Sequence, residues 1–300
     1  MDGDIYRKIN NFWHETTGGQ FALSDVVGMK SFHDYMRDHA YDDLPKRKVA
    51  LLFICLNEPY WPFVKDVVAD ARKFFLPGHE VDFLLWSDMK EPPEGVQLFP
   101  TEPIAWPYPT LFRYHTMLQQ EEKLAEYDYL FYIDVDMRIV SYVGDEILGV
   151  DGEGKPDGLT AAAHPMYFFK DIYFMPFEPN PESTAYVPYP KQYYAGGFQG
   201  GETQEFIEAM KVMRKNIDTD LEKINYRARW NDESHWNPYL IKNPPKIFLD
   251  PGYIYPDSLH EEYYTKIWGR DFSPKIVTLT KKFTLQSMPV GEVQNRLDSA

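Results

Sequence analysis

The 300-residue sequence has one cysteine, Cys55, and no long apolar run. A single cysteine excludes an internal disulfide and a cysteine-rich zinc site, and its place in an apolar stretch is typical of an inert core residue. A membrane-spanning helix needs about 20 consecutive apolar residues, and no stretch approaches that length. The acidic start Met1-Asp2-Gly3-Asp4 lacks the basic and apolar parts of a signal peptide. We therefore expect a cytoplasmic protein without an integral membrane segment.

Positive charge is also scarce. Lys and Arg together number 31 against 46 Asp and Glu, which gives a net charge of −15. Binding to nucleic acid of any sequence requires a basic surface, so we expect no nucleic-acid partner. Hydrophobic residues make up 44% of the chain, enough for the core of a globular protein of this length.

Strand and helix patterns alternate along the chain. Apolar runs predict strands at 49–56, 81–86, 129–133, 159–163 and 246–249. Apolar residues at helical spacing, or helix-favouring composition, predict helices at 63–75, 116–126 and 204–217. Strand–helix–strand order near the N-terminus predicts parallel pairing and a doubly wound sheet. The proline-rich connections 91–93, 103–109 and 176–190 are typical of lids or binding loops.

Two carboxylates, Asp134 and Asp136, directly follow the predicted strand at 129–133. Ligands of open α/β sheets bind at the carboxyl ends of the strands. Neighbouring carboxylates repel each other unless positive charge lies between them, and Mg²⁺ or Mn²⁺ prefers such oxygen ligands. The pattern therefore favours a divalent cation that carries a nucleotide diphosphate. A strand that runs into an acidic turn is the alternative, because Asp-x-Asp alone is common.

Four glycines lie within six positions of the segment 193–201, just before a predicted helix. Glycine allows a ligand to approach the backbone closely. The segment matches neither phosphate-binding glycine motif, so a small-residue floor under a sugar ring is the better interpretation. A plain glycine-rich turn is the alternative.

The segment 230–237 places Asp232 and Glu233 near the start of a predicted helix, between Trp230 and His235. Acids are favoured there by the helix dipole, so capping is the simple explanation. An acid in an aromatic pocket can instead act as nucleophile or base in glycosyl chemistry. We expect His235 to be a hydrogen-bond partner, because no second histidine follows four residues later.

In combination, these segments resemble glycosyltransferase family six, the retaining α-1,3-galactosyl- and N-acetylgalactosaminyltransferases that include the histo-blood-group A and B enzymes. The similar segments occur in the family's order: the metal motif at 131–136, the donor-sugar segment at 185–188 and 193–201, the catalytic segment at 230–235 and a closing strand at 249–253. The resemblance runs from about Val49 to about Asp257.

The resemblance implies a GT-A fold, in which a single Rossmann-like α/β domain with a mixed central sheet spans residues 1–300 and binds a nucleotide sugar. It implies Mn²⁺ or Mg²⁺ on Asp134 and Asp136, and catalytic roles for Glu233 and Asp232. The implied donor-binding residues are Ile54, Cys55, Leu56, Tyr60, Arg113, Asp134, Val135, Ala195, Gly196, Gly197 and Lys281, the last with Lys282 in a basic tail. The implied acceptor-binding residues are His164, Trp230, Glu233 and Asp257.

The implied reaction transfers a sugar from a UDP-sugar donor to a galactoside acceptor, by a covalent glycosyl-enzyme or by attack on the departing face. Gly196 and Gly197 resemble the blood-group A enzyme and predict UDP-GalNAc over UDP-Gal, while His164-Pro165 suggests a fucosylated acceptor. An α-1,3-galactosyltransferase and a catalytically silent sugar-binding relative are the alternatives. A glycosidase would also use paired acids, but it gives no reason for the Asp-x-Asp motif. The lack of the animal enzymes' membrane anchor points to a bacterial or viral member, and Asn231 stands where those enzymes commonly have His.

Overall fold

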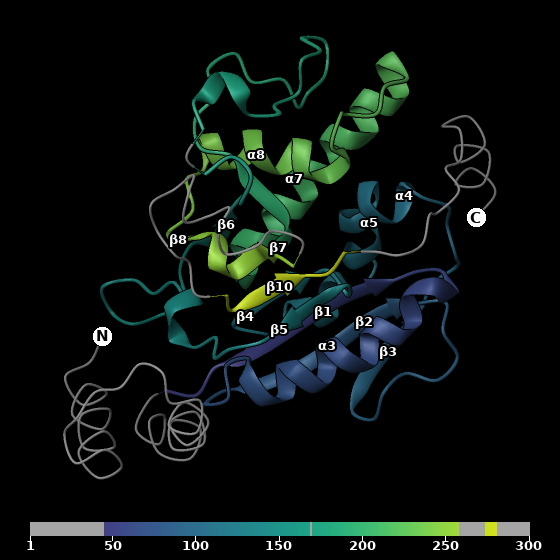
Figure 1. The fold of residues 1–300 in the computed structure, drawn as a ribbon, viewed down its shortest axis with the longest axis vertical. Coiled ribbons are helices and arrows are strands. Elements are labelled where there is room, and N and C mark those ends of the chain that lie inside the picture. Colours follow the sequence, from purple (N-terminus) through teal and green to yellow (C-terminus); the bar gives the residue numbers. More distant parts are fainter. Residues whose placement is uncertain (1–44, 169, 258–273, 281–300) are drawn as a thin grey trace.

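The computed structural model describes residues 45–168, 170–257 and 274–280 (Figure 1). Its central feature is a seven-stranded sheet with the order β3-β2-β1-β4-β7-β6-β8. These strands are β1 (Lys48–Cys55), β2 (Glu80–Ser87), β3 (Val96–Pro100), β4 (Tyr129–Ile133), β6 (Leu159–Ala163), β7 (Tyr194–Glu202) and β8 (Ile247–Leu249). A second, three-stranded sheet contains β5 (Met137–Ile139), β10 (Ile276–Thr278) and β9 (Tyr255–Pro256).

The large sheet is mixed, as expected for a GT-A fold. The four strands β3, β2, β1 and β4 are parallel to one another, which confirms the parallel pairing predicted for the N-terminal part. β7 runs antiparallel to both neighbours, β4 and β6, and β8 is parallel to β6. The direction of pairing therefore changes between β4 and β7, directly beside Asp134.

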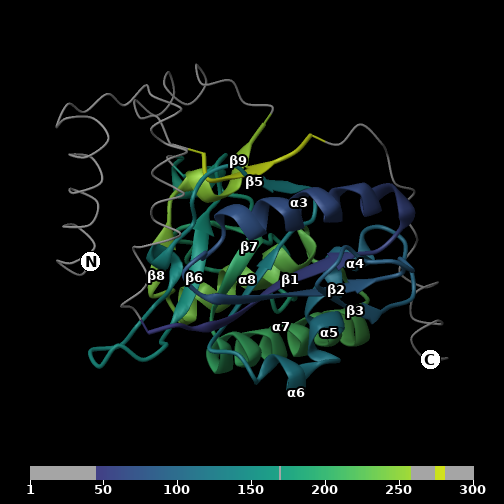
Figure 2. The same ribbon diagram turned by 90° about the horizontal axis from the view of Figure 1, so that it is seen from below.

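Helices cover both faces of the sheet (Figure 2). They are α3 (Trp61–Phe74), α4 (Tyr108–Leu111), α5 (Arg113–Leu118), α6 (Glu121–Leu124), α7 (Thr203–Ile224) and α8 (Asn231–Lys242). Short 3₁₀ helices are η2 (Glu58–Tyr60), η3 (Asp145–Ile147), η4 (Ile172–Phe174) and η5 (Pro251–Ile254). Within the described residues, no helix combines the length and apolarity needed to cross a membrane.

Alternate residues of β1 enter two separate cores. Leu51 and Phe53 pack with the buried stripe of α3, whereas Leu52 and Ile54 pack with residues of α5 and α7. Burial on both faces explains why this strand is continuously apolar rather than alternating.

Most of the predicted elements are confirmed, but three differ. The closing strand implied at 249–253 is instead the last residue of β8, Leu249, followed by the 3₁₀ helix η5. The helix predicted at 116–126 is instead the two short helices α5 and α6, which are interrupted at Gln119 and Gln120. Most of the glycine-rich segment is the strand β7, which contradicts the plain-turn alternative and leaves the sugar-ring floor a prediction. Glycine disfavours strands, so the pairing with β4 and β6 determines this conformation. The strand β3, the helix α4 and the three strands of the second sheet were not predicted.

Candidate active site

A cleft opens at the carboxyl ends of β1 and β4. Its lining contains six of the predicted site residues: Ile54, Leu56, Tyr60, Asp134, Val135 and Asp136. The other lining residues are Asn57, Trp106, Pro109, Thr110 and Tyr132. The cleft therefore joins the expected nucleoside-binding strand end to both acids of the Asp-x-Asp motif.

Cys55 does not share this position, although it lies between two lining residues. Its side chain packs in the core on the α3 face of the sheet, and burial raises the pKa of its thiol. Any contact between Cys55 and a donor would have to come from its main chain.

The remaining lining residues were not predicted individually from the sequence, although the loop 103–109 was predicted to be a lid or a binding loop. Trp106 and Pro109 belong to the connection 103–109, which its composition had marked as a binding loop. Asn57, which follows β1, holds this loop in place: its Nδ2 donates a hydrogen bond to the Ile104 carbonyl at 3.0 Å. Asn57 itself has a positive φ of 83°, which is uncommon for a residue other than glycine.

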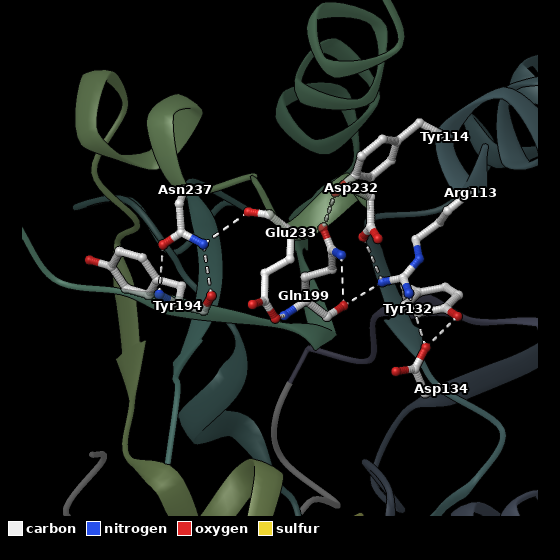
Figure 3. A network of polar contacts seen from close by, with 10 residues as sticks. Arg113, Tyr114, Tyr132, Asp134, Tyr194, Gln199, Asp232, Glu233 and Asn237 are labelled. Carbon is white, nitrogen blue, oxygen red and sulfur yellow. Dashed lines mark hydrogen bonds and ion pairs between the residues drawn. The ribbon is translucent and has the colours of Figure 1, made fainter. Parts of the chain in front are cut away.

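Arg113 of α5 lies at the centre of the polar network (Figure 3). Only 3% of its side chain is exposed, and its Nη2 lies 3.1 Å from Asp134 Oδ1. Its Nη1 lies 3.2 Å from Asp232 Oδ2 and also donates to the Gly196 carbonyl. Burial alone would lower the pKa of Arg113, but the nearby carboxylates, Asp232 foremost, outweigh it and raise that pKa. One buried cation thus links the metal motif to the predicted catalytic segment.

Asp134 is held from a second side. The Tyr132 hydroxyl donates to its Oδ1 at 2.7 Å, and the Tyr132 ring packs 4.0 Å from the Arg113 guanidinium. One third of the Asp134 side chain is exposed. The carboxylate is therefore oriented by protein groups and still accessible from the cleft.

Glu233 lies in the first turn of α8, and both of its carboxylate oxygens are engaged by β7 and the residue before it. Oε1 accepts from the Tyr193 hydroxyl at 2.8 Å, and Oε2 accepts from the Gly196 amide at 2.7 Å. The carboxylate thus faces the sheet rather than capping its own helix. Burial raises its pKa to about 7.

Asp232 is almost fully buried beside Glu233. Burial raises its pKa to about 7; Arg113 opposes the shift, and the charges of Asp134 and Glu233 add to it. The helix that carries both acids is docked on β7 by Asn237, whose side-chain amide bonds both the N–H and the carbonyl of Tyr194, at 2.7 and 2.9 Å.

The two glycines of β7 face different parts of this site. A Cβ at Gly196 would lie 3.2 Å from Glu233 Cβ and 3.4 Å from Asp232 Oδ2. A Cβ at Gly197 would lie 2.9 Å from Asp134 Oδ2 and would collide with Met137 Cε. Ala195 is buried in the core. Neighbouring side chains therefore pack directly against both glycines, and a side chain at either position would crowd the acids.

The carboxylates of the metal motif suit a divalent metal that binds together with the diphosphate of the substrate. Asp134 and Asp136 both line the cleft, and among the described residues no three His, Cys, Asp or Glu side chains are grouped to hold a metal. Mg²⁺ is commonly bound by one or two carboxylates together with substrate phosphates, and this pair matches that pattern.

The predicted basic tail, Lys281 and Lys282, lies outside the described residues. The segment before it reaches the metal motif, because the Leu279 amide donates to the Asp136 carbonyl at 2.9 Å.

Of the other predicted acceptor residues, Trp230 contacts Glu233, His164 contacts its partner Tyr193, and Asp257 contacts neither. The His164 amide donates to the Tyr193 carbonyl at 3.1 Å, and burial lowers the pKa of its ring to about 4. Trp230 directly precedes α8 and is 44% exposed. The Asp257 carboxylate instead accepts from the Thr280 amide at 2.9 Å, between the ends of β9 and β10. Asp257 has no part in the network around Arg113.

Comparison with known proteins identifies the family. The sequence model of glycosyltransferase family 6 matches residues 23–268. The chain belongs to glycosyltransferase family 6. The family implies a nucleotide-sugar donor and a glycan acceptor, and its enzymes generally depend on a divalent metal.

Three relatives of this family 6 chain show how far the similarity extends. Human globoside α-1,3-N-acetylgalactosaminyltransferase 1 is 29% identical over 78% of this chain and 68% of its own length. Rat histo-blood group ABO system transferase 1 is 30% identical over 67% of this chain and 59% of its own length. The O-antigen biosynthesis glycosyltransferase WbnI of Escherichia coli is 26% identical over 74% of this chain and 94% of its own length. The bacterial relative is consistent with the predicted non-animal origin.

Proposed function

We propose that this chain is a metal-dependent, retaining α-1,3-N-acetylgalactosaminyltransferase that uses UDP-GalNAc and a galactoside acceptor, fucosylated as in the A antigen. The observation that carries the proposal is the double ion pair of Arg113, with Asp134 at 3.1 Å and Asp232 at 3.2 Å. Arg113 thus connects Asp134, which is expected to lie at the diphosphate, to Asp232, which is expected to lie at the sugar. A donor could therefore span the site from the cleft to Glu233.

The leaving group is UDP, and the charge on its diphosphate grows as the sugar–phosphate bond breaks. Mn²⁺ or Mg²⁺, when bound by Asp134 and Asp136, would stabilise that charge. Arg113 adds a fixed positive charge that its surroundings already orient. Ile54, Leu56 and Tyr60 would contact the nucleoside in the cleft.

The sugar carbon becomes positive in the same step. The Glu233 carboxylate, aimed by Tyr193 and Gly196, would stabilise this charge or attack the carbon. Asp232 would contact the hydroxyls of the donor sugar. Retention of configuration is compatible with either a covalent intermediate or attack on the departing face.

The preference for GalNAc rests on Gly196 and Gly197. Both glycines lie beside the acids expected to contact the donor sugar, and the pair resembles the blood-group A enzyme at this position. The human relative is named as an N-acetylgalactosaminyltransferase, which agrees with this choice. One methyl group of steric difference at position 197 changes the discrimination between two donors by only about 1–3 kcal/mol. We therefore expect UDP-Gal to be a slow second donor.

Competition between equal concentrations of UDP-GalNAc and UDP-Gal tests the proposal, with Mn²⁺ and a fucosylated or unfucosylated galactoside as acceptor. We expect faster GalNAc transfer, and more product with the fucosylated acceptor. Faster galactose transfer would favour the α-1,3-galactosyltransferase alternative. Binding of UDP without transfer from either donor would favour a catalytically silent relative.

A further inference from the structure

The pairing of β7 with β6 is interrupted beside the catalytic segment. Gln199 pairs with Ala161 and Tyr194 with Ala163, so residues 195–198 of β7 lie opposite Ala162 alone. Such bulges often re-aim groups next to active sites. Here the interruption leaves the amide and carbonyl of Gly196 to side chains: the amide donates to Glu233, and the carbonyl accepts from Arg113 and Gln199.

Gln199 is fully buried and uses both ends of its amide (Figure 3). Its Nε2 donates to the Gly196 carbonyl at 2.8 Å, and its Oε1 accepts from the Tyr114 hydroxyl at 3.0 Å. Tyr114 is also fully buried and follows Arg113 in α5. The helix α5 therefore holds the Gly196 carbonyl twice, directly through Arg113 and indirectly through Tyr114 and Gln199.

We propose that Gln199 is a positioning residue for glycosyl transfer, which with Tyr114 fixes Gly196 so that Glu233 and Arg113 keep their relative places. The inference rests on the proposed function of Glu233. Gln199 acts through Gly196, whose amide holds one Glu233 oxygen and whose carbonyl receives Arg113.

The physical reason is the freedom of the glycine backbone. Without Gln199 the Gly196 carbonyl keeps Arg113 as its one remaining partner among the contacts described, and glycine resists rotation less than any other residue. A shift of about 1 Å in a reacting group can lower the rate about 10²-fold. Binding of UDP should change little, because Gln199 is not among the residues that line the cleft.

Two substitutions separate positioning from general stability. Gln199→Met keeps the length of the side chain and removes its hydrogen bonds, and Tyr114→Phe removes one hydroxyl. Tyr129→Phe is the matched control, because this buried hydroxyl also donates to a carbonyl, that of Gly149 at 2.5 Å, away from the cleft. We expect kcat to fall roughly 10- to 100-fold in Gln199→Met and about threefold in Tyr114→Phe. UDP Kd and donor KM should stay within about twofold, and Tyr129→Phe should keep its kcat.

The double variant should be no slower than Gln199→Met, because Tyr114 acts through Gln199. Wild-type kcat in Gln199→Met, or a raised UDP Kd at unchanged kcat, overturns the inference. If thermal unfolding shows that Gln199→Met does not fold, Tyr114→Phe decides, and an unchanged kcat there overturns it. A wild type that transfers no sugar would instead contradict the proposed function, before any variant is compared.

Discussion

The Glu233 carboxylate accepts hydrogen bonds from the Tyr193 hydroxyl and the Gly196 amide, which fix both of its oxygens. Glu233→Gln keeps the shape of the side chain and removes the charge that would meet the sugar carbon. We expect kcat to fall about 10²–10³-fold while UDP affinity barely changes. UDP release and calorimetric titration of UDP measure the two effects.

Glu146→Gln is a control for this substitution, and it also removes an ion pair with Lys275 at 2.6 Å. Glu146 also accepts from a tyrosine hydroxyl, that of Tyr253 at 2.8 Å, and from a glycine amide, that of Gly144 at 3.0 Å, outside the proposed site. Near-normal turnover in Glu233→Gln would show that this carboxylate serves only to dock α8 on β7.

The raised pKa values of Asp232 and Glu233, about 7 each, predict a pH dependence. Between about pH 4 and 7 the folded protein binds more protons than the unfolded chain, so its stability falls as pH rises through this window. Arg113, Tyr193 and the Gly196 amide face these acids and lower the shift, and Asp134 increases it. Glu233→Gln should therefore raise Tm by roughly 2–4 °C at pH 8 and by less at pH 5.

Activity should show the opposite trend with pH. Because the ionised form of Glu233 is the active one, kcat/KM should fall about tenfold for each unit below pH 7. A Tm difference that is the same at pH 5 and pH 8, or a kcat/KM without an acid limb near 7, would contradict this assignment of the pKa.

Strand β7 carries the donor-sugar prediction. In Gly197→Ala the new methyl would lie 2.9 Å from Asp134 Oδ2 and would displace Met137 Cε. We expect the ratio of GalNAc to galactose transfer to fall, and transfer from both donors to slow about tenfold because Asp134 is crowded. Rates with each donor measured separately provide the test.

Gly152→Ala is a suitable control, because a Cβ at Gly152 would meet nothing within 4 Å. An unchanged donor ratio in Gly197→Ala would refute the two-glycine argument, even if both rates fell.

The same strand shows where prediction from sequence ends. The apolar runs of β1 and β4 can be recognised as strands from the sequence, because each strand is buried on both faces and is therefore continuously apolar. β7 contains four glycines that disfavour a strand, and only its two partner strands determine its conformation. The break at Gln119 and Gln120 likewise depends on how α5 and α6 pack, which periodicity does not encode.

The candidate site divides in a similar way. Asp134, Asp232 and Glu233 stand out because acids directly follow a strand or begin a helix. The partnership between Tyr114 and Gln199 is invisible in the sequence, because 85 residues separate them and Tyr114 belongs to no motif. Arg113 was predicted only through the family resemblance, since nothing local in the sequence marks its contacts with both acids.

Across the whole molecule, the site lies where the sheet changes from parallel to antiparallel. The parallel strands β1 and β4 supply the cleft and the metal motif, while β7 and α8 supply the glycines and the acids. The two parts meet where the Asp134 amide donates to the Gly197 carbonyl at 2.9 Å. We therefore expect metal binding to govern catalysis without governing folding.

Substitution of either metal-motif acid separates these two roles. Asp134→Ala and Asp136→Ala should each abolish transfer and keep the cooperative thermal unfolding of the wild type. An active Asp136→Ala variant would remove that residue from the metal site. Loss of cooperative unfolding would instead indicate a structural role.

UDP release from UDP-GalNAc in the presence of a galactoside acceptor is the most direct test of the central claim. The purified wild-type protein is assayed with Mn²⁺, with EDTA, and with EDTA followed by excess Mn²⁺. We predict acceptor-dependent release with Mn²⁺, loss of that release in EDTA, and recovery when Mn²⁺ is restored. Full activity in EDTA, or no release under any of these conditions, would contradict a metal-dependent glycosyltransferase at Asp134 and Asp136.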